Sequence, residues 1–120
     1  MVRDYKDLVV WKKSMDLVLE VYHLVKKLPK EEIYALSDQM RRSAVSIPSN
    51  IAEGHGRNSD RELIHYLYIA RGSKAELDTQ IQIAINLGYF TSEEAAEAIR
   101  LSNDTGMLIN AFAASITNKQ

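Results

Sequence analysis

A chain of 120 residues with 46% apolar and 26% charged side chains has the size and composition of one globular domain, so we treat residues 1–120 as a single domain. The net charge of −1 argues against a protein whose whole surface coats nucleic acid, and the absence of cysteine excludes disulfides, thiolate metal ligands and a thiol nucleophile. We find no pattern of a signal peptide and no apolar run of about 18 residues, and therefore expect a cytoplasmic protein with no membrane partner.

The first predicted helix covers residues 7–28, where apolar side chains recur at alternating spacings of three and four. A second apolar row runs beside the first, so the apolar arc is wider than the face that a surface helix usually buries. This helix is therefore expected to have two neighbours. Pro29 should end it, because proline cannot continue a helix without losing a hydrogen bond.

The second predicted helix begins near Tyr34 or Leu36 and ends at Gly54 or Gly56. Pro48 falls in its middle, where the proline ring removes a backbone donor and crowds the preceding turn. We therefore expect the helix to kink at Pro48, or to break into two pieces with Pro48 in the first turn of the second piece.

The third and fourth predicted helices are marked by their capping residues. Ser59 followed by Glu62 forms a capping box that opens the third helix, which then runs to Leu87, about 42 Å at 1.5 Å per residue. Gly88 is placed to close it in the left-handed conformation, and residues 91–94 repeat the capping-box pattern before the fourth helix.

Four amphipathic helices with short connections and no predicted strand indicate an all-α protein. The expected architecture is an antiparallel up-down-up-down four-helix bundle with a proline-kinked second helix.

A polar layer is predicted where the second and third helices meet, because a row on the third helix is apolar at both ends and polar in its middle. Buried charge is costly unless it is paired, so Arg42 is expected to pair with Glu76 or Glu53. The layer either fixes helix register and satisfies the backbone carbonyl that Pro48 frees, or offers arginines to an anionic ligand. The predicted layer consists of Arg42, Ser46, Asn50, Glu53, Ser73 and Glu76.

Signals for catalysis or metal binding are weak. His23, His55 and His65 lack the spacing that puts two imidazoles on one helical face, so no metal site is expected. No serine lies in a nucleophile elbow, and no pair of carboxylates is singled out for acid-base work. We therefore expect no enzymatic activity, no cofactor and no small-molecule substrate.

Three longer segments and one dipeptide carry a resemblance to a known family. They are residues 8–18, 39–54 and 69–77 and the pair Gly88-Tyr89, and the segment 39–54 (QMRRSAVSIPSNIAEG) is the most specific. With them, nearly the whole chain resembles the bacterial four-helix-bundle family of ribosomal RNA intervening-sequence proteins. That family was first recognised as open reading frames within insertions in large-subunit ribosomal RNA genes.

The resemblance implies a homopentamer of four-helix bundles, which would account for the wide apolar arcs, and it implies no known catalysis. A related branch, the accessory protein of diversity-generating retroelements, binds nucleic acid and a reverse transcriptase through a basic surface. That relative is more strongly basic than this chain, whose net charge is −1.

The function expected from the sequence is therefore that of a non-enzymatic homo-oligomer associated with nucleic acid, either RNA or DNA. The alternative is a protein interaction scaffold with no nucleic-acid role. The candidate nucleic-acid-binding residues are Lys12, Lys13, Arg41, Arg42, Arg57 and Arg61.

Overall fold

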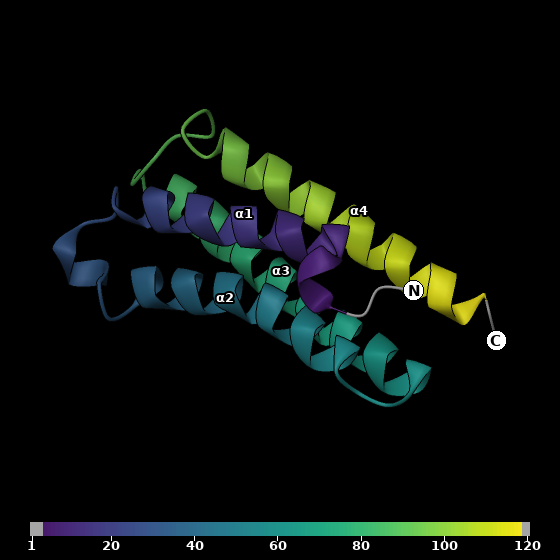
Figure 1. The fold of residues 1–120 in the computed structure, drawn as a ribbon. Coiled ribbons are helices and arrows are strands. Elements are labelled where there is room, and N and C mark those ends of the chain that lie inside the picture. Colours follow the sequence, from purple (N-terminus) through teal and green to yellow (C-terminus); the bar gives the residue numbers. More distant parts are fainter. Residues whose placement is uncertain (1–3, 119–120) are drawn as a thin grey trace.

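The structure is a computed structural model that describes residues 4–118. Within these residues it contains helices and no strand, which confirms the predicted all-α four-helix bundle (Figure 1). The elements in chain order are the 3₁₀ helix η1 (Tyr5–Asp7), α1 (Val9–Val25), the 3₁₀ helix η2 (Lys30–Glu32), α2 (Leu36–His55), α3 (Asp60–Asn86) and α4 (Ala96–Thr117).

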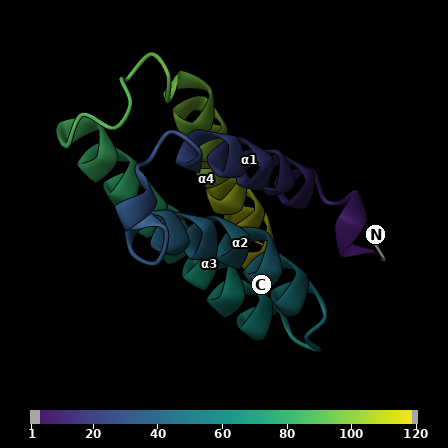
Figure 2. The same cartoon turned by 90° about the vertical axis from the view of Figure 1, so that its left-hand side faces the viewer.

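Each helix of the bundle packs against two neighbours, in the cyclic order α1, α2, α3, α4, and the contact between α2 and α3 is the most extensive. The prediction that the first helix has two neighbours is therefore confirmed. Figures 1 and 2 show consecutive helices running in opposite directions along one long axis, and the molecule measures 47 × 24 × 20 Å. The α2–α3 turn and the two ends of the described chain lie together at one end of the bundle (Figure 1).

The core is built from apolar side chains that every helix contributes. Full burial of a Leu, Ile or Met side chain stabilises the fold by roughly 1.5–3 kcal/mol, so these residues supply most of the driving force for folding. The largest fully buried apolar side chains are Leu17, Val21, Met40, Ile47, Ile51, Leu67, Leu77 and Ile109.

The predicted end of the first helix needs correction. The helix α1 ends at Val25, and the backbone continues through tighter turns, in which Lys27 N–H donates to the Leu24 carbonyl and Leu28 N–H to the Val25 carbonyl. The chain thus leaves α-helical geometry four residues before Pro29. The predicted boundary at residue 28 was one turn too late.

The predicted caps form through local hydrogen bonds. The Ser59 hydroxyl accepts from the Glu62 N–H at 3.2 Å and opens α3, and Gly88 has a φ of +80° where α3 closes. Thr91 and Glu94 form a complete capping box, with reciprocal side-chain to backbone bonds of 2.9 and 3.0 Å. That box opens a separate turn, because α4 begins only at Ala96. The fourth helix therefore begins later than the capping pattern predicts.

The helix α2 is unbroken from Leu36 to His55, so the alternative in which it breaks into two pieces at Pro48 is wrong, while the kink remains a prediction. Pro48 is buried and faces α1. Its missing N–H leaves the carbonyl of Ala44 without its usual helical partner. The Asn50 side-chain amide donates to the Ser46 carbonyl at 2.8 Å, and thus not to the carbonyl that Pro48 frees.

Two glycines give a matched test of how closely α2 and α3 approach. A Cβ at Gly54 would lie 2.7 Å from Tyr66 Cβ, whereas a Cβ at Gly72 meets nothing within 4 Å. We expect Gly54→Ala to lower the free energy of unfolding by about 2 kcal/mol through overpacking, and Gly72→Ala to raise it by about 0.5–1 kcal/mol through helix propensity. Urea unfolding followed by circular dichroism measures both, and equal effects of the two changes would contradict the close approach.

Candidate functional site

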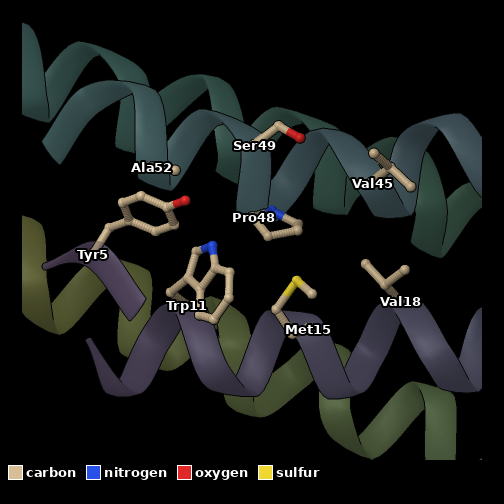
Figure 3. A pocket seen from close by; sticks show the side chains of 8 residues that line it. All are labelled: Tyr5, Trp11, Met15, Val18, Val45, Pro48, Ser49 and Ala52. Carbon is tan, nitrogen blue, oxygen red and sulfur yellow. The ribbon is translucent and has the colours of Figure 1, made fainter. Parts of the chain in front are cut away.

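The structure separates the six predicted nucleic-acid-binding residues into two groups. Lys12 and Lys13 lie near the start of α1, and Arg57 and Arg61 flank the turn between α2 and α3. The start of α1 and the end of α2 meet at the same end of the bundle, because residues of both line one groove (Figure 3). These four cations therefore belong to one end of the molecule.

Arg41 and Arg42 lie apart from that end, beside Tyr22 near the other end of α1. The Arg42 guanidinium bonds to the Asp38 carboxylate at 2.9 Å, and Arg41 donates to the Ile33 carbonyl at 3.3 Å. Both arginines are thus partly neutralised or held by local acceptors. The six residues do not form one continuous patch.

The cations at the α2–α3 end differ in how free their charges are. Arg57 donates to the Tyr66 hydroxyl at 2.7 Å and forms an ion pair with Glu53 at 3.3 Å. Within residues 4–118, no carboxylate lies within ion-pair distance of Lys12, Lys13 or Arg61. These three charges are the ones that an incoming phosphate could use at the lowest cost.

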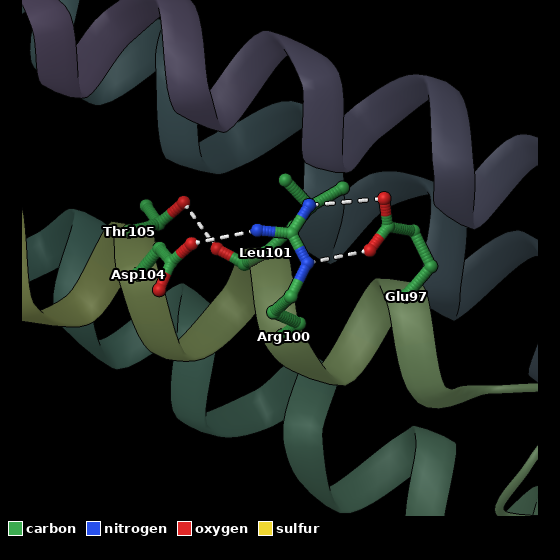
Figure 4. Close-up of polar contacts among 5 residues, drawn as sticks. All are labelled: Glu97, Arg100, Leu101, Asp104 and Thr105. Carbon is green, nitrogen blue, oxygen red and sulfur yellow. Dashed lines mark hydrogen bonds and ion pairs between the residues drawn. The ribbon is translucent and has the colours of Figure 1, made fainter.

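On α4, one arginine is fully engaged by neighbouring carboxylates (Figure 4). Arg100 forms a bidentate pair with Glu97 at 2.7 and 3.0 Å, and a further bond to Asp104 at 3.1 Å. The hydrogen bond from Arg100 lowers the pKa of Glu97, with a smaller contribution from the charge of Lys13. Arg100 is therefore not available to a phosphate, and Lys13 acts on the side of the bundle that faces α4.

The predicted polar layer exists in a smaller form between α2 and α3. The Ser46 and Ser73 hydroxyls are 2.8 Å apart, and the Asn50 amide donates to the Ser46 hydroxyl at 2.9 Å. The three predicted charged members, Arg42, Glu53 and Glu76, are all exposed. Arg42 binds Asp38 and Glu53 binds Arg57, so the expected pairing of Arg42 with Glu76 or Glu53 is absent from the bonds of the described residues.

A second polar contact, between α3 and α4, was missed by the sequence analysis. The Asp78 carboxylate accepts from the Ser102 hydroxyl at 2.6 Å and from the Lys74 ammonium at 2.7 Å. The Lys74 stem lies over Gly106, where an added Cβ would be 2.5 Å from Lys74 Cε. The only sequence signal for this contact is the spacing of two pairs of residues. Ser102 and Gly106 are small and lie four residues apart on α4, and Lys74 and Asp78 lie four residues apart on α3.

The end of the bundle opposite the four cations is held by two cross-element contacts. The Glu32 carboxylate accepts from the Leu36 N–H at 3.3 Å and from the Tyr89 hydroxyl at 2.8 Å. The bond to Glu32 raises the pKa of Tyr89. Lys27 pairs with Glu94 at 3.1 Å. The pKa of Glu94 is lowered, chiefly by its bond from the Thr91 backbone and then by Lys27. These contacts fasten the loops, while Lys26 and Lys30 near this end are exposed and have no ion-pair partner among the described residues.

The described residues offer no arrangement typical of a catalytic or metal site. The groove between α1 and α2, with a volume of about 290 Å³, is lined almost entirely by apolar side chains such as Trp11, Met15 and Pro48 (Figure 3). Across residues 4–118, no three His, Cys, Asp or Glu side chains gather as metal ligands would. Over the same residues, no helix is long and apolar enough to cross a membrane.

Comparison with known proteins identifies the family. The family model described as 23S rRNA-intervening sequence protein matches residues 6–111. This chain belongs to that family. No curated protein matches it. A crystal structure at 1.70 Å of a protein with unknown function, from the S23 ribosomal protein family of Bacteroides thetaiotaomicron, is similar to the chain. The two are 26% identical, with a TM-score of 0.80 over 88% of this chain and 98% of that one.

Membership of the intervening-sequence family agrees with the resemblance found in the sequence. The relative of known structure has unknown function, so it indicates no reaction for this chain. The family name refers to 23S rRNA, and Lys12, Lys13 and Arg61 have no ion-pair partner among the described residues.

The bond between Ser102 and Asp78 can be tested by removing one hydroxyl. Ser102→Ala should lower the free energy of unfolding by about 1.5–2 kcal/mol, because it leaves a partly buried carboxylate one donor short. Ser115→Ala is the matched control, since that exposed hydroxyl bonds only to a carbonyl of its own helix. Urea unfolding of both variants measures the difference, and a loss below 0.5 kcal/mol at Ser102 would show that the contact is dispensable.

Proposed function

We propose that this protein is a non-enzymatic, homo-oligomeric bundle that binds RNA weakly, through the end where α1 begins and α2 ends. The proposal rests on one observation, the presence there of Lys12, Lys13 and Arg61 without ion-pair partners among the described residues. The family name, which refers to 23S ribosomal RNA, supports RNA as the nucleic acid. A cytoplasmic location fits this role.

The charge distribution along the chain favours contacts with α1 and α2 over contacts with α3 and α4. Residues 1–58 carry 10 Lys and Arg against 8 Asp and Glu, and residues 59–120 carry 5 against 8. Phosphate contacts gain affinity by releasing counterions, so a few free cations give weak binding that falls as salt rises. RNA would therefore contact the first half of the chain and avoid the acidic outer surface of its second half.

The RNA proposal is tested by titrating a labelled structured RNA with protein at several salt concentrations. We expect the double change Lys12→Gln and Arg61→Gln to weaken binding at low salt, and to reduce the slope of log K against log salt by about 1.5. The matched control removes Lys26 and Lys30, two exposed cations near the opposite end. Equal losses in both double variants would show a diffuse charge effect, and no RNA binding at low salt would leave a protein scaffold as the better account.

The homopentamer that we propose is supported by apolar side chains left on the outside of the single chain. Val9 and Leu19 of α1 are each 64% exposed, and Met107 of α4 is 71% exposed. Exposure of such apolar side chains to water is unfavourable, and an interface between copies would bury them. They also favour the alternative function, a scaffold that presents several copies of one surface.

Light scattering after size exclusion tests the assembly. At micromolar concentration we expect a mass five times the 13.6 kDa of one chain. Leu19→Glu should reduce this mass, because it places a charge at an apolar contact between copies. Leu87→Glu, at a 56% exposed leucine at the end of α3, is the control. A mass of 13.6 kDa for the unchanged protein would rule out the oligomer.

A further inference from the structure

A shallow groove between α2 and α3 contains a buried polar atom that the fold leaves unpaired. Gln80 is 9% exposed, and its side-chain oxygen Oε1 accepts no hydrogen bond within residues 4–118. Buried polar atoms are bonded in the great majority of proteins, so this exception needs a cause. The groove has a volume of about 370 Å³ and is lined by Gln39, Ala75, Glu76, Thr79, Gln80 and Ile83.

The surroundings of Gln80 favour a cation. The groove is lined by one charged side chain, the carboxylate of Glu76, and by no Lys, Arg or His. Glu76, which shares the groove, is exposed and has no ion-pair partner among the described residues. The nearest cations along the two helices are already bonded: Arg41 to the Ile33 carbonyl, Arg42 to Asp38, and Lys74 to Asp78.

Apolar side chains continue from this groove along α3. Ile83 is 43% exposed and Leu87 is 56% exposed, and four residues apart on a helix they lie on the same face. The surface therefore combines an apolar strip with two acceptors, the carboxylate of Glu76 and the amide oxygen of Gln80. An amphipathic segment with basic and apolar side chains is complementary to it.

We propose that this groove binds a lysine- or arginine-bearing helical segment of a partner protein. One long basic side chain enters beside Ala75 and brings its cationic end to Gln80 Oε1 and Glu76. That oxygen is buried in the free protein, so the side chain of Gln80 has to turn toward the groove when the segment binds. The apolar side chains of the segment lie on Ile83 and Leu87. RNA is disfavoured here because its phosphates would meet Glu76, so this surface is separate from the cationic end of the bundle.

The proposal is tested with a fluorescein-labelled 18-residue helical peptide of alanine and leucine that carries arginine at every fourth position. A second peptide replaces each arginine with citrulline, which keeps the shape and removes the charge. Fluorescence anisotropy gives the dissociation constants. Nitrogen-15 NMR spectra report the side-chain amide of Gln80 directly. We expect binding of the arginine peptide, a shift of the Gln80 amide signals, and little binding of the citrulline peptide.

Two variants separate a binding role from a structural one. Gln80→Met removes the unpaired acceptor, so we expect it to raise the melting temperature by about 3 °C while weakening the arginine peptide about five-fold. Glu76→Gln should weaken the peptide similarly without changing the melting temperature. Glu93→Gln, at an exposed carboxylate outside the groove, should change neither.

Four outcomes would overturn the proposal. One is equal binding of the arginine and citrulline peptides, and another is unchanged peptide affinity in both groove variants. The third is displacement of the peptide by a labelled RNA, which would make the groove part of a nucleic-acid surface. A change of oligomer mass in Glu76→Gln without any peptide binding would likewise reassign the groove to a contact between copies and contradict a separate partner.

Discussion

The close approach of α2 to α3 is the constraint on which the rest of this bundle depends. Gly54 lies against the Cβ of Tyr66, and the hydroxyls of Ser46 and Ser73 meet at 2.8 Å. Small side chains at these points let the two backbones come together, and their packing is the most extensive in the molecule. Once this pair is fixed, Pro48 faces α1 and the arginines of α2 turn outward. The outward position of these charges follows from the packing of the pair.

Features that depend on neighbouring residues could be predicted from the sequence, because their causes are local. Four helices, the cap at Ser59 and the left-handed turn at Gly88 follow from periodicity and capping chemistry. The Thr91 box forms as the pattern indicates, but the chain makes a separate turn before α4, and Ala95 is buried in that turn. A capping pattern identifies a first turn and cannot show whether a long helix follows without interruption.

Partners across helices could not be predicted, because they depend on the register between elements. Arg42 has an acidic neighbour four residues before it, and that local pair forms with little loss of side-chain entropy, whereas a bond to Glu76 would have to hold two exposed side chains of different helices together. The contact of Asp78 with Lys74 and Ser102 could not be predicted for a different reason. Nothing in the sequence singles out Ser102 as the partner of Asp78, because the two residues meet only where α4 packs against α3.

An even number of antiparallel helices returns the chain to the end at which it began. The described chain accordingly starts and finishes beside the α2–α3 turn (Figure 1), which Arg57 and Arg61 flank. A purification tag or a fusion partner at either terminus would share space with that surface and alter its potential. The loops at the far end are closed by Glu32 with Tyr89 and by Lys27 with Glu94, and a label attached there would lie far from that surface.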